Sequence, residues 1–67
     1  MRKISIAELP VDVRPLVESG WTAVVYKGIQ VSGVFPMMIL AKGYIGAVSE
    51  GAADRADYQI VAKDGAK

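Results

Sequence analysis

The chain has 67 residues and a formal net charge of +1, and it contains neither cysteine nor histidine. A chain of this length forms at most one domain, so we expect residues 1–67 to be a single small unit with a frayed tail at 63–67. The missing residue types exclude disulfides, the common zinc sites and catalysis of the Ser-His or Cys-His kind. We therefore expect a protein that is not an enzyme and has no catalytic residue, no metal and no cofactor.

The apolar content of the sequence points to association with another chain. Apolar residues make up 52% of the chain, which is generous for a small protein whose surface dominates its volume. A domain without disulfide or metal support gains only about 3–5 kcal/mol from one core. Because burial against another chain is the remaining source of stability, the composition predicts a homodimer or a partner-bound protein.

The first elements expected along the chain are a short strand and a short helix. Residues 3–6, Lys-Ile-Ser-Ile, alternate polar and apolar side chains, which is typical of a strand. Asp12 is a suitable cap for a helix over residues 13–19, in which Pro15 lies in the first turn. Gly20 suits the position just after the helix end. Such a helix has two turns at most, so it must be held by packing.

A β-hairpin is predicted next, over residues 22–35. Residues 22–26 are rich in β-branched side chains, and Lys27-Gly28 supplies a tight turn. On the return strand 29–35, simple alternation places one face at Ile29, Val31, Gly33 and Phe35.

Two residues interrupt the return strand. Gly33 weakens it and is typical of a bulge or a close backbone approach. Pro36 cannot donate to a sheet ladder, so the strand should end there or lie at an edge.

The second half of the chain also favours β-structure. We expect a buried strand over residues 37–41, a turn at Lys42-Gly43, a further strand over 44–48, a loop or one helical turn capped by Ser49 over 49–57, and a last strand over 58–62. The elements together predict an α+β fold with a small antiparallel sheet of four to five short strands and one short helix. A small SH3-like β-barrel is the alternative.

Aromatic and methionine side chains mark the predicted interaction surface. Trp21 and Tyr26 lie in or beside the first hairpin strand, and Phe35 lies on the second. Met37 and Met38 follow, and flexible thioether side chains suit an adaptable interface as well as a core. We expect these five residues to form a partner or dimer interface, although packing within the sheet is the simpler role for the aromatic ones.

Residues 29–48 raise the question of a membrane segment. Their only charge is Lys42, and the stretch is long enough to span a bilayer as a helix. It is interrupted by glycines and by Pro36, which are more typical of strands and turns. No signal peptide is apparent. We therefore expect a cytoplasmic protein and keep membrane association as the least favoured alternative.

Four segments of residues 1–36 follow a known family pattern, and one of them, Ala-Val-Val at residues 23–25, is similar to the strand that follows the helix. Residues 4–8, Ile-Ser-Ile-Ala-Glu, are similar to an opening strand, and residues 16–20, Leu-Val-Glu-Ser-Gly, to a helix end. Residues 28–36 follow the pattern Gly-x-x-Val-x-x-x-x-Pro. In these features the first half of the chain resembles the N-terminal module of the Phd/YefM-type antitoxins of bacterial toxin–antitoxin pairs.

The resemblance implies a homodimeric, DNA-binding transcription regulator with a toxin as its protein partner. In this family, basic residues near the N-terminus contact duplex DNA, which transfers the role to Arg2, Lys3 and Arg14, with Lys27 as an addition. Phosphate contacts of this kind make the affinity fall steeply with salt. A simpler interpretation is that these residues are solvated surface charges that contact no DNA.

Two other classes of function stay open at this point. The first is a small phage or mobile-element module that inhibits a host protein through a protein–protein interaction. The second is the small membrane-associated protein already considered.

Overall fold

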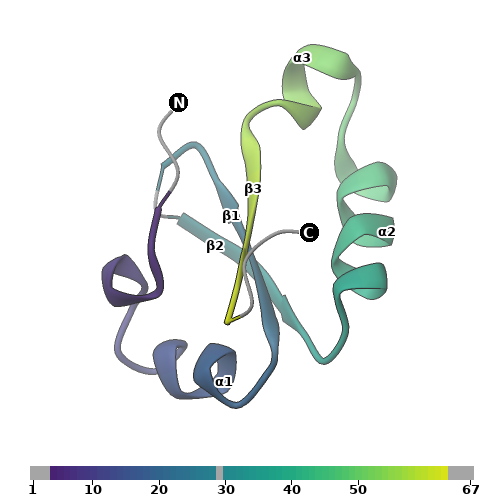
Figure 1. Ribbon diagram of the computed structural model, residues 1–67. Coiled ribbons are helices and arrows are strands. Elements are labelled where there is room, and N and C mark those ends of the chain that lie inside the picture. Colours follow the sequence, from purple (N-terminus) through teal and green to yellow (C-terminus); the bar gives the residue numbers. More distant parts are fainter. Residues whose placement is uncertain (1–3, 29, 64–67) are drawn as a thin grey trace.

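The computed structural model describes residues 4–28 and 30–63 (Figure 1). The elements in chain order are the 3-10 helix η1 (Ile6–Glu8), helix α1 (Arg14–Glu18), strands β1 (Thr22–Tyr26) and β2 (Gln30–Phe35), helices α2 (Met38–Val48) and α3 (Ala52–Arg55), and strand β3 (Tyr58–Ala62). The strands form one open antiparallel sheet in the order β2-β1-β3. The α+β class is confirmed. The described residues contain three strands instead of the predicted four to five, and these strands do not close into a barrel.

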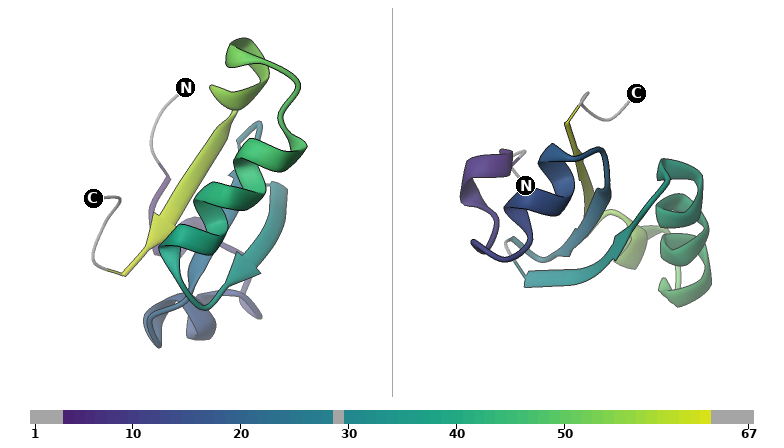
Figure 2. Two further views of the ribbon diagram at one scale, coloured as in Figure 1. Left: turned by 90° about the vertical axis from the view of Figure 1, so that its right-hand side faces the viewer. Right: turned by 90° about the horizontal axis from the view of Figure 1, so that it is seen from below.

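Helices cover both faces of this sheet (Figure 2). On one face, η1 and α1 pack over Ala23, Val25 and Val61, with Leu9, Val13 and Val17 completing the core. On the other face, α2 packs over Val24 through Ala41 and Ile45. Because β1 is central and covered on both faces, its residues 22–25 are all buried.

The predicted hairpin is confirmed, and its turn explains the sequence at that point. Lys27 and Gly28 have φ values of 46° and 100°, and both lie in the left-handed region. Tyr26 pairs with Gln30, so residues 27–29 connect the two strands and the loop has three residues in place of the predicted Lys27-Gly28 turn. Glycine reaches positive φ without steric cost, whereas Lys27 is the only described non-glycine residue that does so.

A β-bulge interrupts the hairpin at the predicted glycine. Val24 pairs with Gly33 and Val25 pairs with Val31, so Ser32 is the extra residue. The bulge also makes the predicted alternation wrong. Val31 shares the α1 face with Val34, while Phe35 packs on the α2 face.

The predicted N-terminal strand is wrong where it falls within the described residues, and Lys3 lies outside them. Residues 6–8 instead form η1. The backbone N–H of Ser5 donates to Glu8 Oε2 at 2.8 Å, and the Glu8 N–H donates to the Ser5 carbonyl at 3.1 Å. Ser-x-x-Glu is a capping-box signature, and this local bonding outweighs a short polar–apolar alternation.

The short helix is confirmed as α1, with Pro15 in its first turn and Gly20 at φ 114° just beyond its end. The expected cap is wrong. Val13 occupies the N-cap position, and no side chain caps the helix. Asp12 is an exposed residue one position earlier.

The largest correction concerns residues 37–48. The predicted strands 37–41 and 44–48 and the turn between them form one helix, α2. Pro36 ends β2 as expected, and Met37 is the N-cap of the helix. Leucine, methionine, alanine and lysine favour helices, and packing on the sheet offsets the cost of Gly43 and Gly46. No helix within the described residues is long and apolar enough to cross a membrane.

The predictions for residues 49–62 are largely confirmed. A short helix, α3, lies within residues 49–57, although Gly51 and not Ser49 is its N-cap. The predicted strand over residues 58–62 is confirmed as β3. Of the expected frayed tail, residues 64–67 lie outside the described residues.

Candidate interaction surface

The most unusual surface of the molecule is the side of α2 that faces away from the sheet. The helix carries Lys42 as its only charge, and Ala41 and Ile45 are buried against β1. On the opposite side Ile39 is 69% exposed and Leu40 is 48% exposed. Figure 2 shows α2 as the outermost element on its face of the sheet.

Small residues continue this surface toward the C-terminal end of the helix. Gly43, Gly46 and Ala47 are exposed. A Cβ atom added at Gly43 or Gly46 would meet nothing within 4 Å, so the space above both residues is open. We call the set Ile39, Leu40, Gly43, Gly46 and Ala47 the α2 outer face. Its N-terminal half is bulky, and its C-terminal half is flat.

A hollow of about 530 Å³ adjoins this face, between α2, α3 and β3. It is lined by Lys42, Ile45, Gly46, Arg55, Tyr58 and Ile60. Both charged residues in this lining are cations, and neither forms an ion pair within the described part of the chain. The remaining lining is mostly apolar.

A tyrosine pair fixes one wall of the hollow. Tyr26 and Tyr58 are cross-strand partners whose ring centres lie 4.6 Å apart. The Tyr26 hydroxyl donates to Asp54 Oδ1 at 3.1 Å, and Asp54 Oδ2 accepts the Glu50 N–H at 3.0 Å. Asp54 therefore joins α3 to the end of the sheet, and both of its carboxylate oxygens accept hydrogen bonds within the fold.

These contacts raise the pKa of both tyrosines above the ordinary value near 10. The hydrogen bond to the Asp54 carboxylate is the main cause of the raised pKa of Tyr26, followed by burial. Burial is the main cause of the raised pKa of Tyr58, and the charge of Asp54 adds to it.

The raised Tyr26 pKa predicts a stability loss at alkaline pH. A pKa that is higher in the folded state stabilises the fold below about pH 10, and this stabilisation is lost as the pH rises through the folded-state pKa. We therefore expect the melting temperature of the wild-type protein to fall more steeply above pH 10 than that of Tyr26→Phe. Thermal melts followed by circular dichroism from pH 8 to pH 11 measure this difference.

Tyr44→Phe is the matched control for this prediction. The Tyr44 hydroxyl lies 2.6 Å from the Ser32 hydroxyl and has no carboxylate partner among the described residues. Its melting curve should follow the wild-type slope above pH 10. Parallel curves for the wild type and Tyr26→Phe would contradict the role of Asp54.

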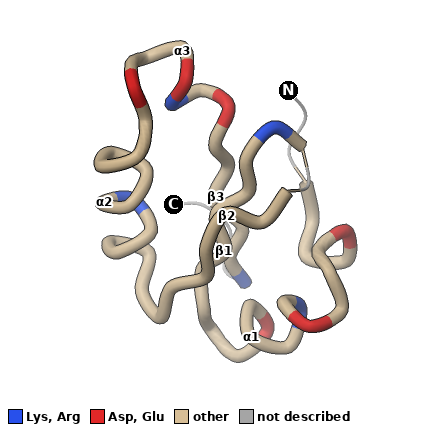
Figure 3. Tube along the Cα trace, turned by 180° about the vertical axis from the view of Figure 1, so that it is seen from behind, with Lys and Arg blue, Asp and Glu red and all other residues tan. Residues whose placement is uncertain are grey.

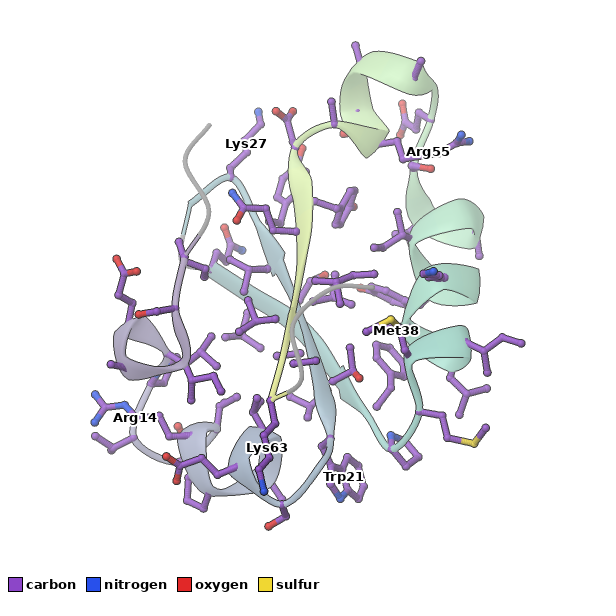
Figure 4. The ribbon with its side chains drawn as sticks, in the orientation of Figure 1. Arg14, Trp21, Lys27, Met38, Arg55 and Lys63 are labelled. Carbon is purple, nitrogen blue, oxygen red and sulfur yellow. The ribbon has the colours of Figure 1, made fainter. Side chains whose placement is uncertain are left out.

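The cations of the predicted DNA-binding set do not gather on one surface within the described residues. Arg14 Nε donates to the Leu9 carbonyl at 2.8 Å beside α1. Lys27 lies at the hairpin turn with its ammonium 5.5 Å from the centre of the Tyr26 ring. Figure 4 shows Arg14 and Lys27 at different ends of the molecule, and Figure 3 shows basic and acidic residues interspersed along the chain. Arg2 and Lys3 lie outside the described residues.

The predicted interface residues are likewise divided. Met37 is 56% exposed at the start of α2, and Met38 is half-buried beside it. Phe35 and Tyr26 are partly buried in ring contacts with Tyr44 and Tyr58.

Trp21 is 37% exposed at the start of β1, and Figure 4 shows it below Met38 at the foot of the sheet. The structure thus brings only the two methionines next to the α2 outer face.

Sequence reasoning missed Ile39, Leu40 and the two cations of the hollow. A signal for the first two was present, because residues 37–48 contain a single charged residue and no polar side that water could cover. Nothing in the sequence indicates that Arg55 and Lys42 line the same hollow, since this depends on where α3 lies beyond the C-terminal end of α2 (Figure 1).

Comparison with known proteins returns no match among protein-family models, curated proteins or solved structures. The resemblance to the Phd/YefM-type antitoxins stays a prediction.

Proposed function

We propose that this protein is a non-enzymatic protein–protein interaction module that binds a second copy of itself through the α2 outer face. The observation that carries the proposal is the 69% exposure of Ile39 on a helix whose opposite side lies in the core. A helix that is apolar all round is normally covered all round.

The shape of the α2 outer face favours a second copy as the partner. In an antiparallel pair of α2 helices that meet at Gly43, residue 39 of one copy lies level with residue 47 of the other, and residue 40 lies level with residue 46. Ile39 and Leu40 of one copy then lie over the flat part of the other, formed by Gly46 and Ala47. Bulky side chains meet open space, and the glycines at the centre let the two helix backbones approach closely. The face is therefore complementary to itself, as a two-fold interface requires.

A dimer needs more contact area than the middle of α2 provides. A stable interface buries about 800 Å² per partner, which is about a fifth of the 4219 Å² that the chain exposes. The eleven residues of α2 extend over about 16 Å, so the interface must include the ends of the helix. Met37 is 56% exposed at the N-terminal end of α2 and extends the apolar surface there.

The test is the oligomeric state of the wild type and of Ile39→Asp. An aspartate at the centre of a dry interface leaves a buried charge without a partner, so we expect dimerisation to weaken about a hundredfold or more. Sedimentation equilibrium over a concentration series measures this change, and far-UV circular dichroism confirms that the variant is folded.

Val11→Asp is the matched control. Val11 is 73% exposed between η1 and α1, on the face of the sheet opposite α2, so the same change there should leave the dimer intact. A wild-type protein that is monomeric at every concentration would overturn self-association. Equal weakening by both substitutions would overturn the choice of the α2 outer face.

A further inference from the structure

We propose that the hollow between α2, α3 and β3 is a binding site for a small organic acid, a ligand with a carboxylate group and an apolar body. This inference goes beyond the proposed function, because the hollow extends from Gly46, which it shares with the α2 outer face, to α3 and β3. It rests on the size of the hollow, on the charge at its wall and on the apolar character of its floor.

The size suits a small molecule. Ligand pockets in proteins commonly measure about 300–1,000 Å³, and this hollow measures about 530 Å³. Gly46 keeps it open on the α2 side, since a Cβ atom there would meet nothing within 4 Å. In the monomer a ligand can therefore lie directly against the helix backbone at Gly46.

The charge in the lining selects an anion. Lys42 comes from the middle of α2 and Arg55 from the end of α3, so two separate elements each supply one cation. Neither cation is neutralised by an ion pair within the described residues. A guanidinium group binds a carboxylate through two parallel hydrogen bonds, and the ammonium adds a second positive charge.

Acidic residues lie near the hollow, and after burial the charges of Asp54 and Glu50 contribute to the raised pKa of Tyr58 in its lining. Asp54 precedes Arg55 directly, but its two oxygens accept hydrogen bonds from the Tyr26 hydroxyl and the Glu50 N–H. No acidic residue lines the hollow. Neither Lys42 nor Arg55 has an ion-pair partner among the described residues, so both are open to a direct ion pair with a ligand carboxylate.

The floor accepts a hydrocarbon or aromatic body. Ile45 is 9% exposed and packs with Ile60 and Tyr58 in the core between α2 and the sheet. The Tyr58 ring is held in place by its contact with Tyr26 at 4.6 Å. A rigid apolar surface of this kind loses little conformational freedom when a ligand covers it.

The experiment is a titration of ¹⁵N-labelled protein followed by two-dimensional NMR, with three probes. Phenylbutyrate carries both the carboxylate and the apolar body, phenylbutanol carries only the body, and acetate carries only the charge. We expect saturable shifts at the amides of Arg55 and Ile60 with phenylbutyrate, at least about tenfold weaker binding of phenylbutanol, and no saturable binding of acetate.

Arg55→Gln and Lys42→Gln should each weaken phenylbutyrate binding several-fold while leaving phenylbutanol binding unchanged. Lys63→Gln is the matched control, because Lys63 lies at the far end of the molecule from Arg55 (Figure 4). Equal binding of phenylbutyrate and phenylbutanol, or equal weakening by all three substitutions, would overturn the proposed carboxylate site. The absence of any saturable shift would do the same.

The same titration in Ile39→Asp separates this inference from the proposed function. Arg55 and Ile60 do not belong to the α2 outer face, so their shifts report the hollow and not the dimer. Binding that persists in a monomeric variant supports the site even where self-association fails. A dimer that forms without binding the acid supports only the proposed function.

Discussion

Replacing Leu9 with alanine is expected to lower the free energy of unfolding by about 2–5 kcal/mol. Leu9 is 1% exposed and belongs to the core cluster on the α1 face of the sheet, although it lies in the connection between η1 and α1. A chain of this length has roughly 3–10 kcal/mol of total stability, so the substitution removes a large share of it. Urea denaturation followed by Trp21 fluorescence and circular dichroism measures the loss.

Leu16→Ala is the matched control for this prediction. It removes the same atoms from a leucine that is 39% exposed on α1, and we expect it to cost less than about 1 kcal/mol. Equal losses for the two substitutions would mean that Leu9 is not the buried centre of the N-terminal segment. Neither residue lies on the α2 outer face, so the comparison is independent of the proposed dimer.

The hairpin and β3 could be predicted from the sequence because their signals are local. Gly28 permits positive φ in the loop of the hairpin, and the β-branched residues before it suit a strand. Gly33 indicated the bulge correctly. The bulge then inverted the alternation beyond it, which simple counting along residues 29–35 does not anticipate.

The helix α2 could not be predicted in the same way. Helices on a protein surface are recognised by one apolar and one polar side, and residues 38–48 have no polar side. Gly43 and Gly46 suggested turns instead. The information that decides this segment is tertiary, because the α2 face of the sheet, with Val24 at its centre, has to be covered by an apolar element.

The α2 outer face exists because residues 38–48 form a helix instead of the predicted strands. A strand over residues 37–41 would place Ile39 and Leu40 on opposite sides, whereas a helix places both on the side away from the sheet. The hollow depends further on the position of Arg55 relative to Lys42, to which the hydrogen bond between Tyr26 and Asp54 contributes by joining α3 to β1. Contacts between residues so distant in the chain leave no pattern in a single sequence.

Two glycine-to-alanine substitutions are expected to change stability in opposite directions. A Cβ atom at Gly33 would lie 2.9 Å from Phe35 Cε2, so the Phe35 ring has to move. That ring packs against Tyr44 of α2, with ring centres 5.1 Å apart. Because displacing the ring disturbs the contact that joins β2 to α2, Gly33→Ala should cost about 1–3 kcal/mol.

Gly43→Ala makes the same chemical change where the space is open. Gly43 lies in the middle of α2, and an added Cβ would meet nothing within 4 Å, so the substitution should stabilise the folded chain by about 0.5–1 kcal/mol through its higher helix propensity. Urea denaturation of both variants at a concentration where the protein is monomeric measures the two effects. In a Phe35→Leu background the cost of Gly33→Ala should shrink, because the smaller side chain leaves room for the new methyl group. A cost that stays unchanged there would show that strain in the bulge backbone, and not the Phe35 ring, excludes a side chain at position 33.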